Sequence, residues 1–336
     1  MAGIGRSRVA ATPYGRRLVK LVVVTTLVLA GCTSTSADDE APSAPSSSAP
    51  ATADAVQASV DAFFANDFAD AYRNRRAVLV SVAGDVIVED YFESDPATTT
   101  NIQSVGKSIV ATLIGLALAD GHLNGLDQTL AELLPEDATA MSSTTKQITL
   151  RQLLTMTSGL PTDEAFYLQV LDQPDWVRYM LASGPATAPS AEFAYSSAGS
   201  HLLSAILQHA TGMTTLEYAR ERLSDPLGIS TTPETPVLAT TADLPAYDAA
   251  VGFTWPTDPQ GVHIGGGGLK LTAGDMLKLG RLWLEEGRWG GEELVPATWL
   301  QEATQSHVQS MYPVAPGYGY QFWVTEADGH PAFCAF

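Results

Sequence analysis

The stretch NIQSVGKSIVATLIGLALADG, residues 101–121, decides the fold and raises the first functional question. Its long apolar run predicts a buried helix. Ser104 and Lys107 stand three residues apart where this helix begins, and residues i and i+3 lie on one helical face. The pattern therefore indicates either a nucleophile with its base or two ordinary residues at a helix end.

The limits of this helix follow from local signals. Asn101 or Thr100 is expected to cap its start, because either side chain can accept a hydrogen bond from a free amide of the first turn. The helix is expected to run toward Asp120, and Gly121 is well placed to end it in the left-handed conformation.

A serine–lysine pair at a helix start can support covalent catalysis. A serine hydroxyl is a weak nucleophile, and a lysine can act as its base only if the lysine pKa falls well below about 10.4. The helix macrodipole disfavours a charged lysine, and the free amides offer donors to an oxyanion. The alternative is an exposed lysine one turn from a helix cap, because Ser-x-x-Lys alone often occurs by chance.

The segment AEFAYSSAGSHLLSAIL, residues 191–207, offers a second set of polar groups just before another predicted helix. The phenol of Tyr195, or its anion, can relay a proton between a serine and a leaving group. Ser197, two residues on, can donate a hydrogen bond to the same site. The alternative for Tyr195 is a half-buried tyrosine of the core.

In this order, Ser104-x-x-Lys107 and Tyr195-x-Ser197 resemble the first two motifs of the penicillin-recognising serine hydrolases. That superfamily comprises class C β-lactamases, D-alanyl-D-alanine carboxypeptidases, related esterases and aminohexanoate-oligomer hydrolases. ITLRQLLTMTSGLP and GGGGLKLTAGDMLKLGRLWLEEGRW are also similar to segments of that group, so the resemblance covers about residues 72–336.

The resemblance implies a fold and a set of roles. The fold is the β-lactamase-like α/β (α+β) fold, in which an antiparallel sheet is flanked by helices and an all-α lobe is inserted between the strands of the two chain ends. Ser104 would be the acylated nucleophile, Lys107 its general base and Tyr195 a proton shuttle, while the Ser104 amide would form half of the oxyanion hole. No cofactor is implied.

Two departures from the family pattern bear on activity. Ser197 stands where the family usually has asparagine, so this substrate-binding position is a variant that favours an esterase or amide hydrolase over a dedicated β-lactamase. The third motif, Lys-Thr-Gly or His-x-Gly, is missing, since His330-Pro331-Ala332 lacks the glycine and lies at a predicted turn. We expect it beyond Phe336, on final strands that this sequence does not contain.

Local signals divide the chain into three parts. Residues 1–31 hold five basic residues and a short apolar run that ends in Leu-Ala-Gly before Cys32, which predicts a lipoprotein signal peptide with lipid attached to Cys32. A plain signal peptide with an incidental cysteine is the alternative, and the export route stays open. Residues 32–54, rich in Ser, Pro and Ala, predict a disordered tether. Residues 55–336 form the expected hydrolase domain, held at the outer face of the bacterial cytoplasmic membrane.

Several turn and cap signals lie within the domain. AVLVSVAGDVIVEDYFE, residues 77–93, and GYGYQFWVTEADGHPAFCAF, residues 317–336, each predict a β-hairpin. Thr149 is expected to begin a short helix, and Thr272 with Asp275 is expected to form a capping box at the start of another.

Composition excludes several other classes of function. Without its first 31 residues the chain carries a net charge of −24, which argues against nucleic-acid binding. No His-Glu-x-x-His pattern indicates a metal, and His201 and His209 are expected to pack or face solvent. The glycines at 265–268 are not followed by a phosphate-binding lysine–serine pair, and the family resemblance places them at the rim of the active site. Cys334 is expected in the core, without a disulfide.

The sequence therefore predicts a serine hydrolase that acts on amide or ester bonds of a small molecule or peptide through an acyl-enzyme. A module that binds penicillin or cell-wall peptides without turnover is one alternative, and an inactive fragment is another. The sequence does not decide the oligomeric state.

Overall fold

The computed structural model describes residues 52–65, 74–162 and 164–336. The expected signal peptide, Cys32 and nearly all of the expected tether lie outside these residues. The first helix, α1 (Ala53–Ala65), begins two residues before the expected start of the domain at 55.

The remaining helices are α2 (Val105–Ala119), α3 (Leu130–Leu133), η1 (Pro135–Asp137), α4 (Ser143–Lys146), α5 (Leu150–Leu154), α6 (Glu164–Leu171), α7 (Trp176–Ser183), α8 (Ser197–Thr211), α9 (Thr215–Ala219), η2 (Arg220–Ser224), α10 (Leu244–Ala249), α11 (Ala273–Leu284) and α12 (Ala297–Ala303). The strands are β1 (Ala77–Val82), β2 (Asp85–Tyr91), β3 (Thr99–Asn101), β4 (Lys270–Thr272), β5 (Arg288–Trp289), β6 (Glu292–Glu293), β7 (Val308–Gln309), β8 (Gly317–Tyr318), β9 (Trp323–Ala327) and β10 (His330–Cys334).

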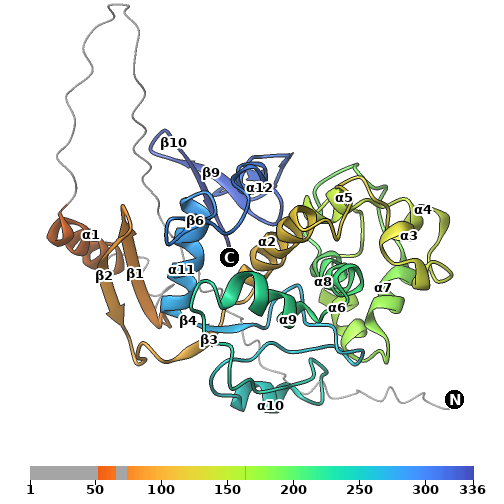
Figure 1. Ribbon diagram of the computed structural model, residues 1–336, viewed down its shortest axis with the longest axis horizontal. Helices are drawn as coiled ribbons and strands as arrows, with labels where there is room; N and C mark the ends of the chain where they lie inside the picture. The colour runs from red at the N-terminus through yellow and green to blue at the C-terminus, as the bar shows by residue number, and fades with distance from the viewer. Residues whose placement is uncertain (1–51, 66–73, 163) are drawn as a thin grey trace, which may run out of the picture.

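These elements form two lobes (Figure 1). One lobe combines strands from both ends of the chain with α1, α11 and α12, and the other gathers helices α3 to α8. Helix α2 runs between the two lobes. The expected combination of a strand-bearing lobe and an inserted helical lobe is confirmed.

Both predicted hairpins are present. Strands β1 and β2 meet at a two-residue turn, Ala83-Gly84, and strands β9 and β10 meet at Asp328-Gly329. All four turn residues have positive φ, between 51° and 90°. This is the type I′ geometry, whose twist matches that of the strands, and it explains why small or acidic residues paired with glycine mark both turns.

The strands pair antiparallel throughout, but they do not form one sheet. Strands β7 to β10 form a four-stranded sheet, whereas β1 with β2, β3 with β4, and β5 with β6 form separate pairs. Within the described residues β1 has β2 as its one strand partner and β10 has β9. A cavity of about 200 Å³ lies between these two strands and is lined by residues of both, including Ala77, Leu79 and Phe333. The single flanked sheet expected from the sequence is therefore divided in this structure.

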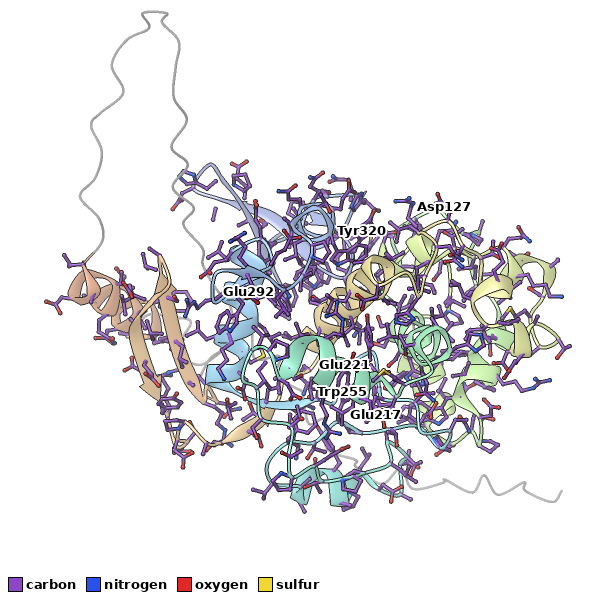
Figure 2. The ribbon with its side chains drawn as sticks, viewed as in Figure 1. Asp127, Glu217, Glu221, Trp255, Glu292 and Tyr320 are labelled. Atoms are coloured by element: carbon purple, nitrogen blue, oxygen red, sulfur yellow. The ribbon has the colours of Figure 1, made fainter. Side chains whose placement is uncertain are left out.

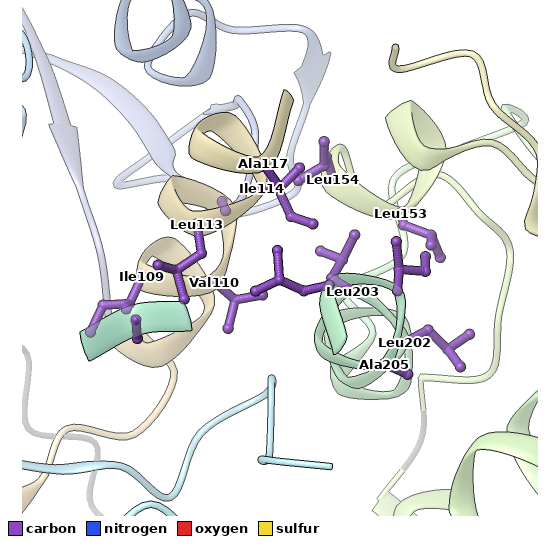
Figure 3. Packing of buried hydrophobic residues seen from close by; sticks show 14 of the residues in the cluster. Ile109, Val110, Leu113, Ile114, Ala117, Leu153, Leu154, Leu202, Leu203 and Ala205 are labelled. Atoms are coloured by element: carbon purple, nitrogen blue, oxygen red, sulfur yellow. The ribbon is translucent and has the colours of Figure 1, made fainter. Parts of the chain in front are cut away.

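The core is centred on α2 and α8. Nearly every residue of α2 is buried, and its apolar side chains face those of α8 and α5 (Figure 3). Val110, Leu113 and Leu203 are fully buried at this contact. A helix that is apolar on all sides needs neighbours on all sides, so residues 101–121 occupy the centre of the domain. No helix in the part of the chain that the structure describes has both the length and the apolarity needed to cross a membrane.

Candidate active site

Ser104 stands at the N-cap of α2, where its backbone is helical (φ −72°, ψ −6°) and its hydroxyl caps no amide of the helix. Thr149 and Ser196, at the N-caps of α5 and α8, each accept a hydrogen bond from an amide of the first turn. Since the Ser104 hydroxyl is not used in this way, it is available for another partner.

The expected caps, Asn101 and Thr100, are wrong. Both residues lie in β3, which pairs with β4, and three residues separate the end of this strand from the first residue of α2. The Asn101 side chain accepts a hydrogen bond from the Gln103 amide at 2.9 Å, and Gln103 has a φ of 53°. This short turn connects β3 to α2 and places Ser104 at the N-cap of the helix. Gly121 ends α2 with a φ of 78°, as expected.

Lys107 is buried beside Ser104, with 1% of its surface exposed. Its Nζ donates to the Ser104 Oγ at 2.9 Å and to the Gly266 carbonyl at 2.5 Å. Burial lowers the pKa of Lys107 from its ordinary 10.5 to about 7. Near neutral pH a large share of the amine is thus unprotonated, which is the form that can accept a proton from the serine.

The ring of Tyr195 packs next to the amine of Lys107. Lys107 Nζ lies 4.9 Å from the centre of the Tyr195 ring, and that ring stacks on Trp323 at 5.5 Å. Burial raises the pKa of Tyr195 to about 12, although a hydrogen bond with the Ser104 side chain opposes this effect. The side chain is therefore a neutral phenol near pH 7, which can donate and accept a proton.

Ser197 begins α8, and a glycine loop presses against it. A Cβ at Gly266 would lie 3.1 Å from the Ser197 Cβ, and a Cβ at Gly265 would lie 2.1 Å from the Ser200 carbonyl oxygen. Glycine is required because any side chain here would separate the loop from the helix start. The loop at 265–268, expected at the rim of the active site, also supplies the Gly266 carbonyl that accepts a hydrogen bond from Lys107.

The structure brings Ser104, Lys107, Tyr195 and the start of α8 together from segments up to 93 residues apart. The Ser104 amide has no hydrogen-bond acceptor among the described residues, so it is free to face a ligand. His330, excluded as part of the third motif, is exposed at the start of β10.

Sequence reasoning missed the residues that support this group from the C-terminal segment. Tyr318 and Trp323 line an aromatic cluster against the Tyr195 ring, and Gln321 lies between them in the chain. The pattern of residues 317–336 predicts a hairpin, and no motif within it points to the site.

The histidines and the cysteine noted in the sequence lie in different environments. His201 is buried on α8 and its Nε2 lies 3.1 Å from Asp258 Oδ2, whereas His209 is exposed. Within the ranges that the structure describes, no three His, Cys, Asp or Glu residues form a group that could hold a metal ion. Cys334 is a half-buried free thiol whose pKa burial raises to about 11.

The burial of Lys107 predicts a pH-dependent stability difference. The pKa of the Lys107 amine is about 7 in the folded chain and 10.5 by its ordinary value. Between these two pH values the amine binds a proton only in the unfolded chain, so the free energy of unfolding of the wild-type chain falls as pH falls. In Lys107→Met this loss is absent. The free energy of unfolding of the variant should therefore rise relative to wild type by about 1 kcal/mol for each pH unit from 10 to 7. Urea unfolding of both chains at four pH values measures this gap, and a constant gap would contradict the assigned pKa.

Comparison with known proteins gives the family. The model of the family described as "Beta-lactamase" matches residues 60–335. The D-alanyl-D-alanine-carboxypeptidase/endopeptidase AmpH of Escherichia coli (strain K12) is 25% identical over 255 residues, which are 69% of this chain and 64% of that protein. Penicillin-binding protein 4 of Amycolatopsis lactamdurans is 26% identical over 246 residues, which are 68% of this chain and 63% of that protein. The chain thus spans a little under two thirds of the length of these relatives.

A solved structure shows the same fold. The octameric penicillin-binding protein homologue from Pyrococcus abyssi superposes with a TM-score of 0.62 at 19% identity, and the match covers 82% of this chain and 67% of that one. The antiparallel strands, the inserted helices and the family match over most of the sequence agree with one another. The chain belongs to the β-lactamase family.

Proposed function

We propose that this protein is a serine hydrolase that cleaves amide or ester bonds through an acyl-enzyme on Ser104. One observation carries the proposal: the amine of Lys107, buried and with its pKa lowered to about 7, lies 2.9 Å from the Ser104 hydroxyl, which accepts no capping hydrogen bond from α2. A buried lysine without an ion-pair partner lowers stability, and catalysis gives a reason for keeping it.

The reaction begins when Ser104 Oγ attacks the substrate carbonyl carbon and Lys107 Nζ takes the hydroxyl proton. The oxygen of the tetrahedral intermediate becomes negative, and the free Ser104 amide donates to it. As the bond to the leaving amine or alcohol breaks, the proton moves from Lys107 through the Tyr195 phenol to the leaving group. A water molecule then attacks the acyl-enzyme, its proton passes to the same base, and the carboxylic acid is released while Ser104 regains its proton.

Substrate preference can be argued from the second motif and from the relatives. Ser197 at the start of α8 offers a hydroxyl where the family usually has an amide, which supports an esterase or a peptide or amide hydrolase over a dedicated β-lactamase. The AmpH relative is a D-alanyl-D-alanine-carboxypeptidase/endopeptidase by name. We therefore propose an acyclic ester or amide as substrate.

Side-by-side assays test this proposal. We expect turnover of p-nitrophenyl butyrate or of a peptide ending in D-alanyl-D-alanine, and a slower reaction with the β-lactam nitrocefin. Fast nitrocefin hydrolysis with no ester or peptide turnover would contradict the preference.

A second candidate is a binding protein that is acylated but does not turn over, and the name of the Amycolatopsis relative favours it. It predicts one equivalent of covalent β-lactam label on Ser104 and no further product. An inactive chain, which neither hydrolyses a substrate nor becomes acylated, would show no label.

The neutral phenol of Tyr195 gives a separate prediction. Tyr195→Phe removes the hydroxyl and keeps the stack on Trp323, so the fold should persist while protonation of the leaving group slows. We expect kcat for an amide substrate to fall about 100-fold, with a smaller effect on an activated ester whose leaving group needs no proton. Steady-state rates with the two substrates measure the difference. Equal losses with both would assign Tyr195 a purely structural role.

A further inference from the structure

We propose that Gln321 is a positioning residue that fixes the start of α8 relative to the start of α2, and so sets Tyr195 against the Ser104–Lys107 pair. The inference rests on the proposed function of Ser104, Lys107 and Tyr195. It assigns a specific role to a residue that belongs to neither motif.

The side chain of Gln321 joins two helices of the inserted lobe. Its Nε2 donates to the carbonyl oxygens of Leu153 and Leu154, both at 3.0 Å, at the end of α5. Its Oε1 accepts from the Ser200 Oγ on α8 at 2.8 Å. Every donor and acceptor of the amide therefore has a partner, which fixes its orientation.

The backbone of Gln321 completes the junction. Its N–H donates to the Leu154 carbonyl at 3.0 Å, and its carbonyl accepts from the Ser108 Oγ on α2 at 2.6 Å. Gln321 is 2% exposed, so these bonds are shielded from water. One residue thus contacts α2, α5 and α8 by hydrogen bonds.

The residues that Gln321 contacts on α2 and α8 lie close to the starts of these helices, where the site residues stand. Ser108 directly follows Lys107 in α2, and Ser200 lies three residues after Ser197 in α8. Figure 3 shows α5 beside these two helices, with Leu153 and Leu154 facing them. A shift of Gln321 would therefore move one catalytic helix start relative to the other, and misplacement by about 1 Å can cost about 100-fold in rate.

The backbone conformation supports a role beyond packing. Gln321 has a φ of 61°, a left-handed conformation that is strained for a residue with a side chain. Glycine would adopt it without strain, but glycine would lose the side-chain bonds to α5 and α8. The strained turn also directs the chain toward Trp323, whose ring stacks on Tyr195.

The flanking residue holds the same segment independently. The Tyr320 hydroxyl accepts a hydrogen bond from Arg151 at 2.9 Å, and Arg151 also contacts Asp127 at 3.1 Å. Tyr320 and Asp127 lie in the upper half of Figure 2. Because this anchor remains when the Gln321 side chain is removed, Gln321→Gly should keep the segment in place.

Two serines of α8 provide a matched pair of variants. Ser200→Ala removes the bond from α8 to Gln321, whereas Ser204→Ala removes a buried bond from the same helix to Thr215, which is 2.7 Å away. Both changes delete one buried hydroxyl. A merely structural contribution would affect the two variants alike.

The test measures kcat and KM for a peptide ending in D-alanyl-D-alanine, whose leaving amine needs a proton, together with Ser104 labelling by a fluorophosphonate and melting temperature. We expect Ser200→Ala and Gln321→Gly to lower kcat about tenfold or more with KM within twofold, while Ser204→Ala changes kcat less than twofold at a similar melting temperature. In a Tyr195→Phe background, Ser200→Ala should add less than a twofold loss, because the group that it positions is already gone.

Three results would overturn the inference. Equal losses in Ser200→Ala and Ser204→Ala, or a full tenfold loss in the Tyr195→Phe background, would assign Gln321 a structural role alone. Failure of the wild-type chain itself to label or turn over would overturn the proposed function, and this positioning role with it.

Discussion

Ser104→Ala is expected to lower kcat/KM for ester hydrolysis by about 10⁴-fold or more and to abolish covalent labelling. Without the hydroxyl no acyl-enzyme can form, and the Lys107 amine loses the partner that now lies 2.9 Å away. Because the Ser104 hydroxyl caps no amide of α2, the substitution should leave the helix start and the melting temperature nearly unchanged. Chromogenic ester assays and thermal unfolding measure the two effects.

Ser142→Ala is the matched control for this variant. Ser142 also stands at a helix N-cap, but its hydroxyl accepts a hydrogen bond from the Thr145 amide. Its removal should lower the free energy of unfolding by about 1 kcal/mol and leave kcat/KM within twofold. If Ser104→Ala kept more than about a tenth of the wild-type rate, Ser104 would not be the nucleophile.

Lys107→Met is expected to slow acylation of Ser104 by about 10³-fold and to remove its pH dependence. The amine accepts a proton only when it is neutral, and its pKa is about 7. In the wild-type chain the acylation rate should therefore rise about tenfold per pH unit up to pH 7 and level off above it. Lys107→Arg should be equally slow, because a guanidinium stays protonated in proteins. Labelling rates from pH 5 to 9 measure both features.

Lys270→Met is the matched control for the base. Lys270 is a second buried lysine, 7% exposed, whose Nζ donates to the Tyr247 and Ala250 carbonyls rather than to a serine. Its pKa is also lowered by burial. We expect this variant to lose stability, but the acylation rate should keep its pH dependence with a midpoint near pH 7. The assignment of the base would be contradicted if Lys270→Met shifted the midpoint of this pH dependence and if Lys107→Met, although slow, kept the midpoint near pH 7.

Local sequence signals predicted much of the fold because they depend on neighbouring residues. The two hairpin turns each need positive φ, and Ala83-Gly84 and Asp328-Gly329 supply it. Thr149 begins α5 as expected, and Thr272 caps α11 by accepting from the Asp275 amide. The capping box expected at Thr272 is incomplete, because the Asp275 carboxylate accepts from the Thr272 hydroxyl instead of from its backbone amide. Such interactions span a few residues, so the sequence pattern is sufficient to place them.

The start of α2 shows where local signals fail. Asn101 is a good cap by residue type, but its pairing with Lys270 of β4 holds it in a strand. That pairing is set by a residue 169 positions away, which no local pattern reveals. The result is that Ser104 takes the N-cap position and its hydroxyl turns to Lys107.

The environment of the site was equally beyond local prediction. The spacing of Ser104 and Lys107 predicts that they are neighbours, and they are. The pKa of Lys107, however, depends on burial by distant segments, including the loop that brings Gly266 to its amine. Gln321 and Trp323 belong to an ordinary strand pattern, and their importance follows only from their partners Ser200 and Tyr195.

Mass spectrometry of the intact chain after reaction with a fluorophosphonate, followed by peptide mapping, shows whether Ser104 is the nucleophile. We expect a single adduct, located on Ser104, whose rate of formation rises with pH up to about 7. A folded chain that acquires no adduct, or one that is modified on a different serine, would contradict this assignment.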